Sequence, residues 1–172
     1  PYLQRRFESY HGVADLFCYF YERGLRLLKP GGRLGYISSN TFFKTAFGKP
    51  LREYLLKDAT IESVVDFGDV QIFEGVTTYP AIVVLKNMVA GSDHELQFWK
   101  LDALPETNFL ANWEAAKELY PQSALGFSSW ELENSALRTL REKIRTGRQT
   151  LKEVYGSPLR GVVTGLNSAF VI

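Results

Sequence analysis

The segment Leu27–Ile37 constrains the fold more than any other part of the chain. It reads Leu-Leu-Lys-Pro-Gly-Gly-Arg-Leu-Gly-Tyr-Ile and predicts a helix, an abrupt stop and a buried strand, in that order. Pro30 cannot continue a helix, because it lacks a backbone N–H and clashes with the preceding turn. Gly31 and Gly32 allow the tight reversal that turns the chain into a sheet. The segment therefore predicts an α/β fold.

The hydrophobic pattern extends this prediction along the chain. Helical spacing predicts three helices, over residues 14–28, 50–57 and 132–144. Runs of β-branched and apolar residues predict four strands, over residues 33–38, 61–67, 81–86 and 95–101. The second and third strands should be antiparallel neighbours, because their connection is too short for a crossover helix. Residues 102–129 show no clear period and are predicted to form a linker over the surface.

The first predicted helix carries one apolar stripe that we expect to face the core. Its members are Leu16, Phe17, Phe20, Tyr21, Gly24, Leu25 and Leu28. Asp15 falls in the first turn, where the helix dipole favours a carboxylate.

Composition and charge exclude several classes of protein. With 172 residues and 45% hydrophobic residues, the chain is large enough for one ordinary globular core. Its single cysteine, Cys18, cannot form an internal disulfide, and its two histidines are isolated, so no metal site is expected. No apolar run is long enough for a membrane span, and no signal-peptide pattern is present, which predicts the reducing cytoplasm.

Charge is distributed unevenly, although the net charge is only +1. Residues 91–134 carry two basic and eight acidic residues, whereas residues 135–172 carry seven basic and two acidic residues. This asymmetry suggests a different partner for the C-terminal part, but a solvated helix face would produce the same pattern. The chain begins at Pro1 without an initiator methionine and ends within an apolar run, so we expect it to be a segment of a longer protein.

Four stretches in one order carry a resemblance to a known family. They are Pro1-Tyr2, Asp15-Leu16-Phe17-Cys18-Tyr19-Phe20, the Phe67–Thr78 segment with Phe-Gly-Asp and Ile-Phe-Glu-Gly-Val-Thr-Thr, and Arg160–Phe170. Together with the Lys-Pro-Gly-Gly turn, they resemble the adenine-N6 DNA methyltransferases of the Asn-Pro-Pro-Tyr class. The branch they resemble is fused into single-chain restriction-modification enzymes. The resemblance implies the C-terminal part of a class I, Rossmann-like methyltransferase sheet with an antiparallel hairpin and a helical connector.

The chemistry of this family explains the residues that it uses. An exocyclic amino group is a poor nucleophile, and in a duplex it is stacked and paired, so the base must be flipped out and held between apolar faces. Acceptors placed against the amino hydrogens then free its lone pair for in-line attack on the sulfonium methyl group, so catalysis is mostly positioning and electrostatic preorganisation.

The resemblance implies a role for several residues of this chain. Pro1 and Tyr2 would end the catalytic motif, with Tyr2 stacked on the flipped adenine and Phe73 packed against it from the other side. Phe20 and Asp15 would lie at the S-adenosylmethionine site, although Phe20 could equally belong to the core and Asp15 could simply begin a helix. Phe73 is harder to explain as core, because it lies in a glycine-containing loop.

Candidate DNA contacts follow partly from charge and partly from the resemblance. The candidates are Lys44, Arg138, Arg141, Arg160, Thr164 and Asn167. Basic side chains of this kind position a protein on phosphates without reading sequence. For the basic cluster that contains Arg138 and Arg141, a solvated helix face is an equally good explanation.

The resemblance also implies a domain organisation. Residues 1–101 would be the C-terminal half of the catalytic domain, residues 102–152 a linker and connector helix, and residues 153–172 the start of a target-recognition domain. The expected partners are double-stranded DNA with a flipped adenine and the upstream half of the same protein, which would bind most of the S-adenosylmethionine. The segment alone should be inactive, and its exposed sheet surface could pair two copies.

Two other classes of function stay open from the sequence. A class I methyltransferase acting on RNA, protein or a small molecule would share the Lys-Pro-Gly-Gly turn, with less reason for Phe73 or the 160–170 segment. A non-catalytic DNA-binding module could keep the fold without the activity; it would bind DNA in a salt-dependent way and would not bind the methyl donor.

Overall fold

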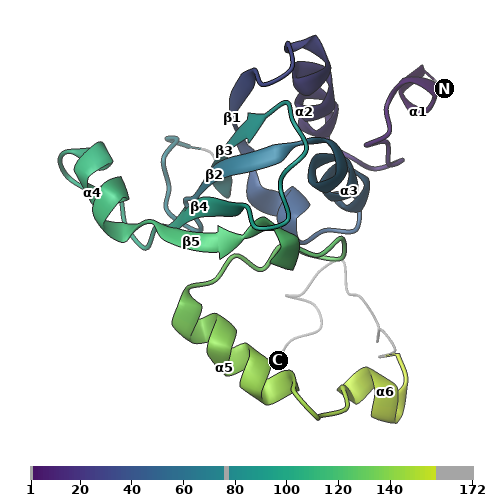
Figure 1. Cartoon of the computed structure of the whole chain (residues 1–172), viewed down its shortest axis with the longest axis vertical. Helices are drawn as coiled ribbons and strands as arrows, with labels where there is room; N and C mark the ends of the chain where they lie inside the picture. The colour runs from purple at the N-terminus through teal and green to yellow at the C-terminus, as the bar shows by residue number, and fades with distance from the viewer. Residues whose placement is uncertain (1, 76–77, 158–172) are drawn as a thin grey trace, which may run out of the picture. The chain divides into compact units, whose positions relative to one another are not determined.

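The computed structural model describes residues 2–75 and 78–157, in which one five-stranded sheet organises the first 133 residues (Figure 1). Its strands lie in the order β1-β3-β2-β4-β5. The strand bounds are β1 Arg33–Ser39, β2 Thr60–Asp66, β3 Pro80–Lys86, β4 Glu95–Lys100 and β5 Glu118–Pro121. β3 is antiparallel to both β1 and β2, β4 is parallel to β2, and β5 is antiparallel to β4. β1, β2 and β4 therefore run in one direction, and their carboxyl ends share one edge of the sheet.

The predicted helix-stop-strand turn is confirmed. Helix α2, Leu16–Leu27, is followed by β1 from Arg33, and Gly31 adopts a φ of +77°, in the left-handed region that favours glycine. Asn87 closes the turn, because its side chain donates to the carbonyl of Leu28 at 3.0 Å. The main chains of Gly31 and Gly32 also exchange hydrogen bonds with Asn87, at 2.9 and 2.8 Å. The turn thus fixes how α2 is placed against the sheet.

α2 and α3, Lys49–Asp58, share the main core with one face of the sheet. α3 begins with Pro50 near its first position, as the sequence predicts. The helices contribute fully buried side chains such as Tyr21 and Leu55, which pack with Val64 and Val83 of the sheet. A second, smaller cluster around Val65 and Phe67 forms elsewhere in the sheet, with Trp99 and Trp113 packed against it.

The predicted apolar stripe of α2 is partly wrong. Leu16 and Phe20 are 58% and 54% exposed. The buried residues of the helix are instead Cys18, Tyr19, Tyr21, Glu22 and Leu25. The reason is that residues 7–11 fold back over one side of α2, where the Tyr19 ring packs on Phe7 and its hydroxyl donates to the carbonyl of His11 at 3.1 Å.

Residues 102–129 are not a linker over the surface. They contain α4, Phe109–Ala116, the edge strand β5 and a short 3-10 helix η2, Gln122–Ala124. Gln122 is buried and joins this segment to β2: its side chain accepts from the backbone N–H of Ile61 at 2.8 Å and donates to the carbonyl of Ala59 at 3.0 Å. The segment therefore completes the core of the sheet.

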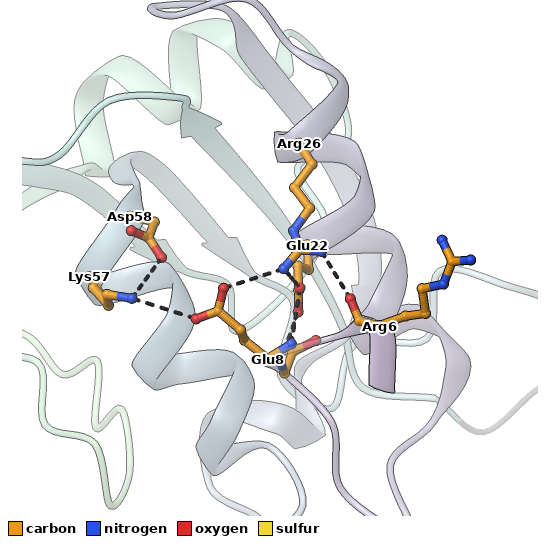
Figure 2. Close-up of polar contacts among 7 residues, drawn as sticks. Arg6, Glu8, Glu22, Arg26, Lys57 and Asp58 are labelled. Atoms are coloured by element: carbon orange, nitrogen blue, oxygen red, sulfur yellow. Dashed lines mark hydrogen bonds and ion pairs between the residues drawn. The ribbon is translucent and has the colours of Figure 1, made fainter. Parts of the chain in front are cut away.

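A buried carboxylate holds the N-terminal segment against α2 (Figure 2). Glu22 is fully buried and accepts from the backbone N–H groups of Glu8, at 3.0 Å, and Ser9, at 2.7 Å. It also forms an ion pair with Arg26 at 2.5 Å, and Arg26 donates to the carbonyl of Arg6 at 2.9 Å. Lys57 of α3 approaches Glu8 at 3.5 Å. The network ties residues 6–9 to both helices.

Gly48 is required by a close backbone approach. A Cβ atom at this position would lie 2.2 Å from the carbonyl oxygen of Phe42 and 2.6 Å from its Cα. Gly48→Ala should therefore lower the free energy of unfolding by about 1–3 kcal/mol, because main-chain atoms must move to admit the methyl group. Urea denaturation measures this loss. Gly35→Ala is the matched control, since its Cβ would meet no atom within 4 Å and should cost little; equal losses for the two variants would contradict the close approach.

Residues 134–157 belong to a second compact unit. Within its described part, α5 covers Ser135–Arg145, close to the predicted bounds, and α6 covers Leu151–Tyr155. Asn134 begins α5 by accepting from the backbone N–H of Leu137 at 2.8 Å, and Thr150 and Glu153 form a capping box at the start of α6. The predicted strand-like segment after Pro158 lies outside the described residues.

Candidate functional site

A pocket of about 340 Å³ opens at the edge where β1, β2 and β4 end. In open α/β sheets, ligands bind beyond the carboxyl ends of the strands, where loops rather than helix faces line the space. The pocket is lined by Asn40, Thr41, Phe43, Lys44, Thr45, Asp66, Gly68, Asp69, Tyr79, Lys100, Trp130, Glu131, Leu132 and Glu133. All of these residues belong to the first 133 residues of the chain.

The polar centre of this pocket is built from the ends of two strands. Asn40 follows β1 and Asp66 ends β2, and the Asn40 amide donates to Asp66 Oδ1 at 2.8 Å. The same oxygen accepts from the backbone N–H of Gly68 at 2.9 Å. The backbone N–H of Asn40 donates to the carbonyl of Tyr79 at 2.6 Å. These bonds join the loop after β1 to both ends of the loop that connects β2 and β3.

The loop between β2 and β3 carries Phe73 at the surface. Its ring is 47% exposed, and neighbouring Gly75 adopts a φ of +71°, which favours a residue without Cβ. The loop starts with Gly68 and Asp69 and returns through Tyr79, all of which line the pocket. Phe73 is thus a large apolar side chain without core contacts, on a loop rooted at the pocket, which agrees with the prediction that it is not a core residue.

The structure does not bring Tyr2 and Phe73 together. Tyr2 lies in α1, Tyr2–Arg6, with its side chain 68% exposed. The end of α1 is held at Arg26, in the last turn of α2, whereas the Phe73 loop follows the carboxyl end of β2. Figure 1 shows α1 and this loop on opposite sides of the sheet. A slot formed by the two rings is therefore absent from the described residues, and the pairing stays a prediction.

The two residues expected at the methyl-donor site lie at the start and on the exposed side of α2. Asp15 is the N-cap of the helix and accepts from the backbone N–H of Leu16 at 2.7 Å. Phe20 presents a half-exposed ring, so the alternative that it is a core residue is wrong. Adenosine offers a flat ring and hydroxyl donors. An exposed aromatic face is suited to the ring, and the second carboxylate oxygen of Asp15 is suited to accept from a hydroxyl group.

The candidate DNA contacts fall in different parts of the chain. Lys44, at the end of the 3-10 helix η1, Asn40–Phe43, is exposed and lines the pocket. Arg138 and Arg141 lie on α5 in the second unit, and both are only partly exposed. Three further candidates and one residue of the predicted catalytic motif lie outside the described residues: Arg160, Thr164, Asn167 and Pro1.

Several pocket residues were not singled out by the sequence. The polar run that contains Asn40 predicts a loop that opens into a site. The only feature of the sequence that could have indicated Asp66, the hydrogen-bond partner of Asn40, is an acidic residue at the end of an apolar strand. Lys100 likewise ends β4. Trp130, which is almost fully buried, gave no periodic signal at all, because it packs on Phe42 and Phe43 from a segment without regular structure.

Neither a thiol nucleophile nor a metal cluster is available in the described part of the chain. Burial raises the pKa of the Cys18 thiol to about 12, helped by the nearby Asp15 carboxylate, so it is protonated at neutral pH. Within residues 2–75 and 78–157, no group of histidine, cysteine and acidic side chains could hold a metal ion.

Comparison with known proteins shows which proteins have similar sequences. Residues 1–73 match the family described as Eco57I restriction-modification methylase. The type II methyltransferase M.XhoI of Xanthomonas vasicola is 43% identical over 82 residues, which cover 47% of this chain and 15% of that protein. The type II restriction enzyme and methyltransferase RM.Eco57I of Escherichia coli is 27% identical over 172 residues, 98% of this chain and 17% of that protein. Over residues 1–73 the chain is therefore similar to the restriction-modification methylases.

A solved structure agrees with this family in its fold. It is described as a class I S-adenosylmethionine-dependent methyltransferase of Listeria monocytogenes, with a TM-score of 0.52 and 21% identity, covering 64% of this chain and 35% of the other. At that identity the likeness shows the fold alone, and it confirms the predicted α/β class. The chain spans only 15% and 17% of the lengths of the two relatives.

The helices give no sign of membrane insertion. Among the described residues, no helix has the length and apolar character that crossing a bilayer requires.

Proposed function

We propose that this chain is part of a DNA adenine-N6 methyltransferase of a restriction-modification system, with S-adenosylmethionine as the methyl donor. The observation that carries the proposal is the match of residues 1–73 to a restriction-modification methylase family, together with an aromatic loop rooted at the pocket where β1 and β2 end. Both relatives are named as methyltransferases, and one of them is also named as a restriction enzyme. A fused endonuclease in the complete protein is part of the same proposal.

In this proposal the chain's own residues hold and orient the reactants. Phe73 packs against the flipped adenine, a role that its half-exposed ring and its loop support. Tyr2 covers the other face, which requires α1 to leave the position in which Arg26 holds its end. Phe20 and Asp15 border the donor, which supplies the electrophilic methyl group, while the upstream half makes most of the donor contacts. Lys44, which is exposed, and Arg138 and Arg141, which are partly exposed, contact DNA phosphates.

The sheet offers a place for the upstream half. β1 is an edge strand that pairs only with β3 in the part of the chain described, so its other edge has unpaired main-chain groups. We propose that strands of the upstream half extend the sheet there, and that residues 153–172 begin a target-recognition domain. Without the upstream half, the free edge could instead pair two copies. The complete protein would act in the cytoplasm, where its DNA substrate lies.

A transfer assay with the complete protein tests this function. With S-adenosylmethionine labelled in the methyl group, we expect label in double-stranded DNA, and none in RNA or total protein. Label in RNA or protein would instead support a class I methyltransferase with another acceptor. Salt-dependent DNA binding without any transfer or donor binding would support a non-catalytic DNA-binding module.

A further inference from the structure

Arg52 of α3 is fully buried, and the described part of the chain gives it no ion pair. Every acceptor that the structure provides for its guanidinium group is a main-chain carbonyl. Nε donates to Phe127 at 3.0 Å, Nη2 to Ser128 at 2.6 Å, and Nη1 both to Thr45 at 3.0 Å and to Phe42. Burial lowers the pKa of Arg52 from its usual value.

These four carbonyls come from two segments that are far apart in the sequence. Phe42 and Thr45 lie in and after η1, whereas Phe127 and Ser128 follow η2 and lie 75 and 76 residues after Arg52. A backbone bond adds to the junction, since the N–H of Trp130 donates to the carbonyl of Phe43 at 2.8 Å. The Trp130 ring also packs on Phe43, with ring centroids 5.6 Å apart.

The same two segments form two walls of the pocket. One wall comes from residues 40–45 and the other from residues 130–133, each directly adjacent to the carbonyls that Arg52 holds. The third side of the pocket is formed by the two ends of the Phe73 loop, Gly68 and Asp69 at one end and Tyr79 at the other. Asn40, in the first wall, is hydrogen-bonded to Asp66 and to Tyr79 and so is connected to both ends of this loop. A shift of the first wall would therefore also move the base of the Phe73 loop.

We propose that Arg52 is a positioning residue that sets the separation of the two pocket walls, and through it the fit of the DNA substrate. This inference rests on the proposed function and adds to it a residue that determines how the DNA substrate fits the pocket. Arg52 itself does not touch the substrate; it acts through the main chain of residues 42–45 and 127–128.

Physical chemistry favours a shaping role for this residue over a purely stabilising one. A buried cation without a counter-ion loses its hydration, and an apolar residue of similar volume would often cost the fold less. The planar guanidinium group has five donors in a fixed fork, so one side chain can hold carbonyls from both segments. A lysine ammonium is a point charge on a flexible stem and cannot fix the same separation.

Steady-state kinetics of the complete methyltransferase test the proposal with Arg52→Lys. We expect the KM for DNA to rise about tenfold, as for the loss of one or two hydrogen bonds from a charged group, while the Kd for S-adenosylmethionine stays unchanged. Arg23→Ala is the control, because Arg23 is an exposed arginine of α2. An Arg52→Lys enzyme with wild-type KM for DNA, or with donor binding weakened to the same extent, would overturn the proposal.

Chemical rescue separates shaping from a general loss of folding. Arg52→Ala leaves a cavity of guanidinium shape, so added guanidinium ion, well below denaturing concentrations, should lower the raised KM for DNA. Sodium chloride at the same ionic strength should not. An Arg52→Ala protein that is unfolded with and without guanidinium would assign Arg52 to the whole fold and contradict the inference. If the wild-type enzyme transfers no methyl group to DNA, it is the proposed function that fails, and the two failures are thereby distinguished.

Discussion

Phe73→Ala in the complete methyltransferase should lower kcat by about 10²-fold, while the affinity for S-adenosylmethionine stays unchanged. Stacking of a base on an aromatic ring contributes about 1–3 kcal/mol per base, and a flipped base that loses this face is no longer held for in-line attack. The ring is half-exposed on a loop and has no core role to lose, so the fold should tolerate the change. Single-turnover methyl transfer and donor binding measure the two quantities separately.

Two further variants make the Phe73 result specific. Phe73→Trp keeps an aromatic face and should retain most of the turnover. Met88→Ala removes an apolar side chain of similar exposure, 50%, from the segment after β3, outside the pocket lining, and should leave kcat unchanged. Unchanged turnover in Phe73→Ala, or equal losses in both alanine variants, would remove Phe73 from the site.

Glu22→Ala should lower the free energy of unfolding of the chain by about 3 kcal/mol, the largest stability effect that we expect. The substitution leaves the backbone N–H groups of Glu8 and Ser9 without their acceptor and removes the ion-pair partner of Arg26 (Figure 2). Because Glu22 is fully buried, water replaces these contacts poorly. Urea denaturation monitored by tryptophan fluorescence gives the change from the midpoint and slope.

The control for this prediction is Glu8→Ala. Glu8 takes part in the same network, but its side chain is 57% exposed and its ion pairs with Arg26 and Lys57 are 3.3 and 3.5 Å long. Exposed pairs contribute about 0–1 kcal/mol, so this variant should differ little from the wild type. Similar losses for the two variants would mean that burial does not set the strength of the network.

The sequence predicted those features of the fold that depend on local rules. The Lys-Pro-Gly-Gly turn, α2, α3 and the first four strands follow from proline and glycine geometry and from hydrophobic runs, and all are present within a few residues of the expected bounds. The antiparallel pairing of β2 with β3 followed from loop length alone.

Features that depend on distant contacts could not be predicted in this way. The sequence of residues 102–129 predicts a linker because β5 is short. The segment is instead stabilised by pairing with β4 and by Gln122 contacts with residues more than 60 positions away. The buried faces of α2 were misjudged because Glu22 is polar in sequence, yet residues 6–9 fold over it. Arg52 is likewise buried only through partners 75 and 76 residues away in the sequence.

The candidate site was predicted in part. The loop after β1 and the exposed position of Phe73 were expected, whereas the Asn40–Asp66 contact exists only because β1 and β2 run in the same direction and end at one edge. The predicted Tyr2–Phe73 pair depends on how α1 is placed, and the contacts that hold its end, at Arg26, are tertiary.

Single-molecule sequencing of plasmid DNA exposed to the complete protein tests the central claim most directly. We expect N6-methyladenine at one short recurring sequence, with modification that requires S-adenosylmethionine and is lost in Phe73→Ala. Plasmid that stays unmodified, or methyl groups found on cytosine instead of adenine, would contradict it.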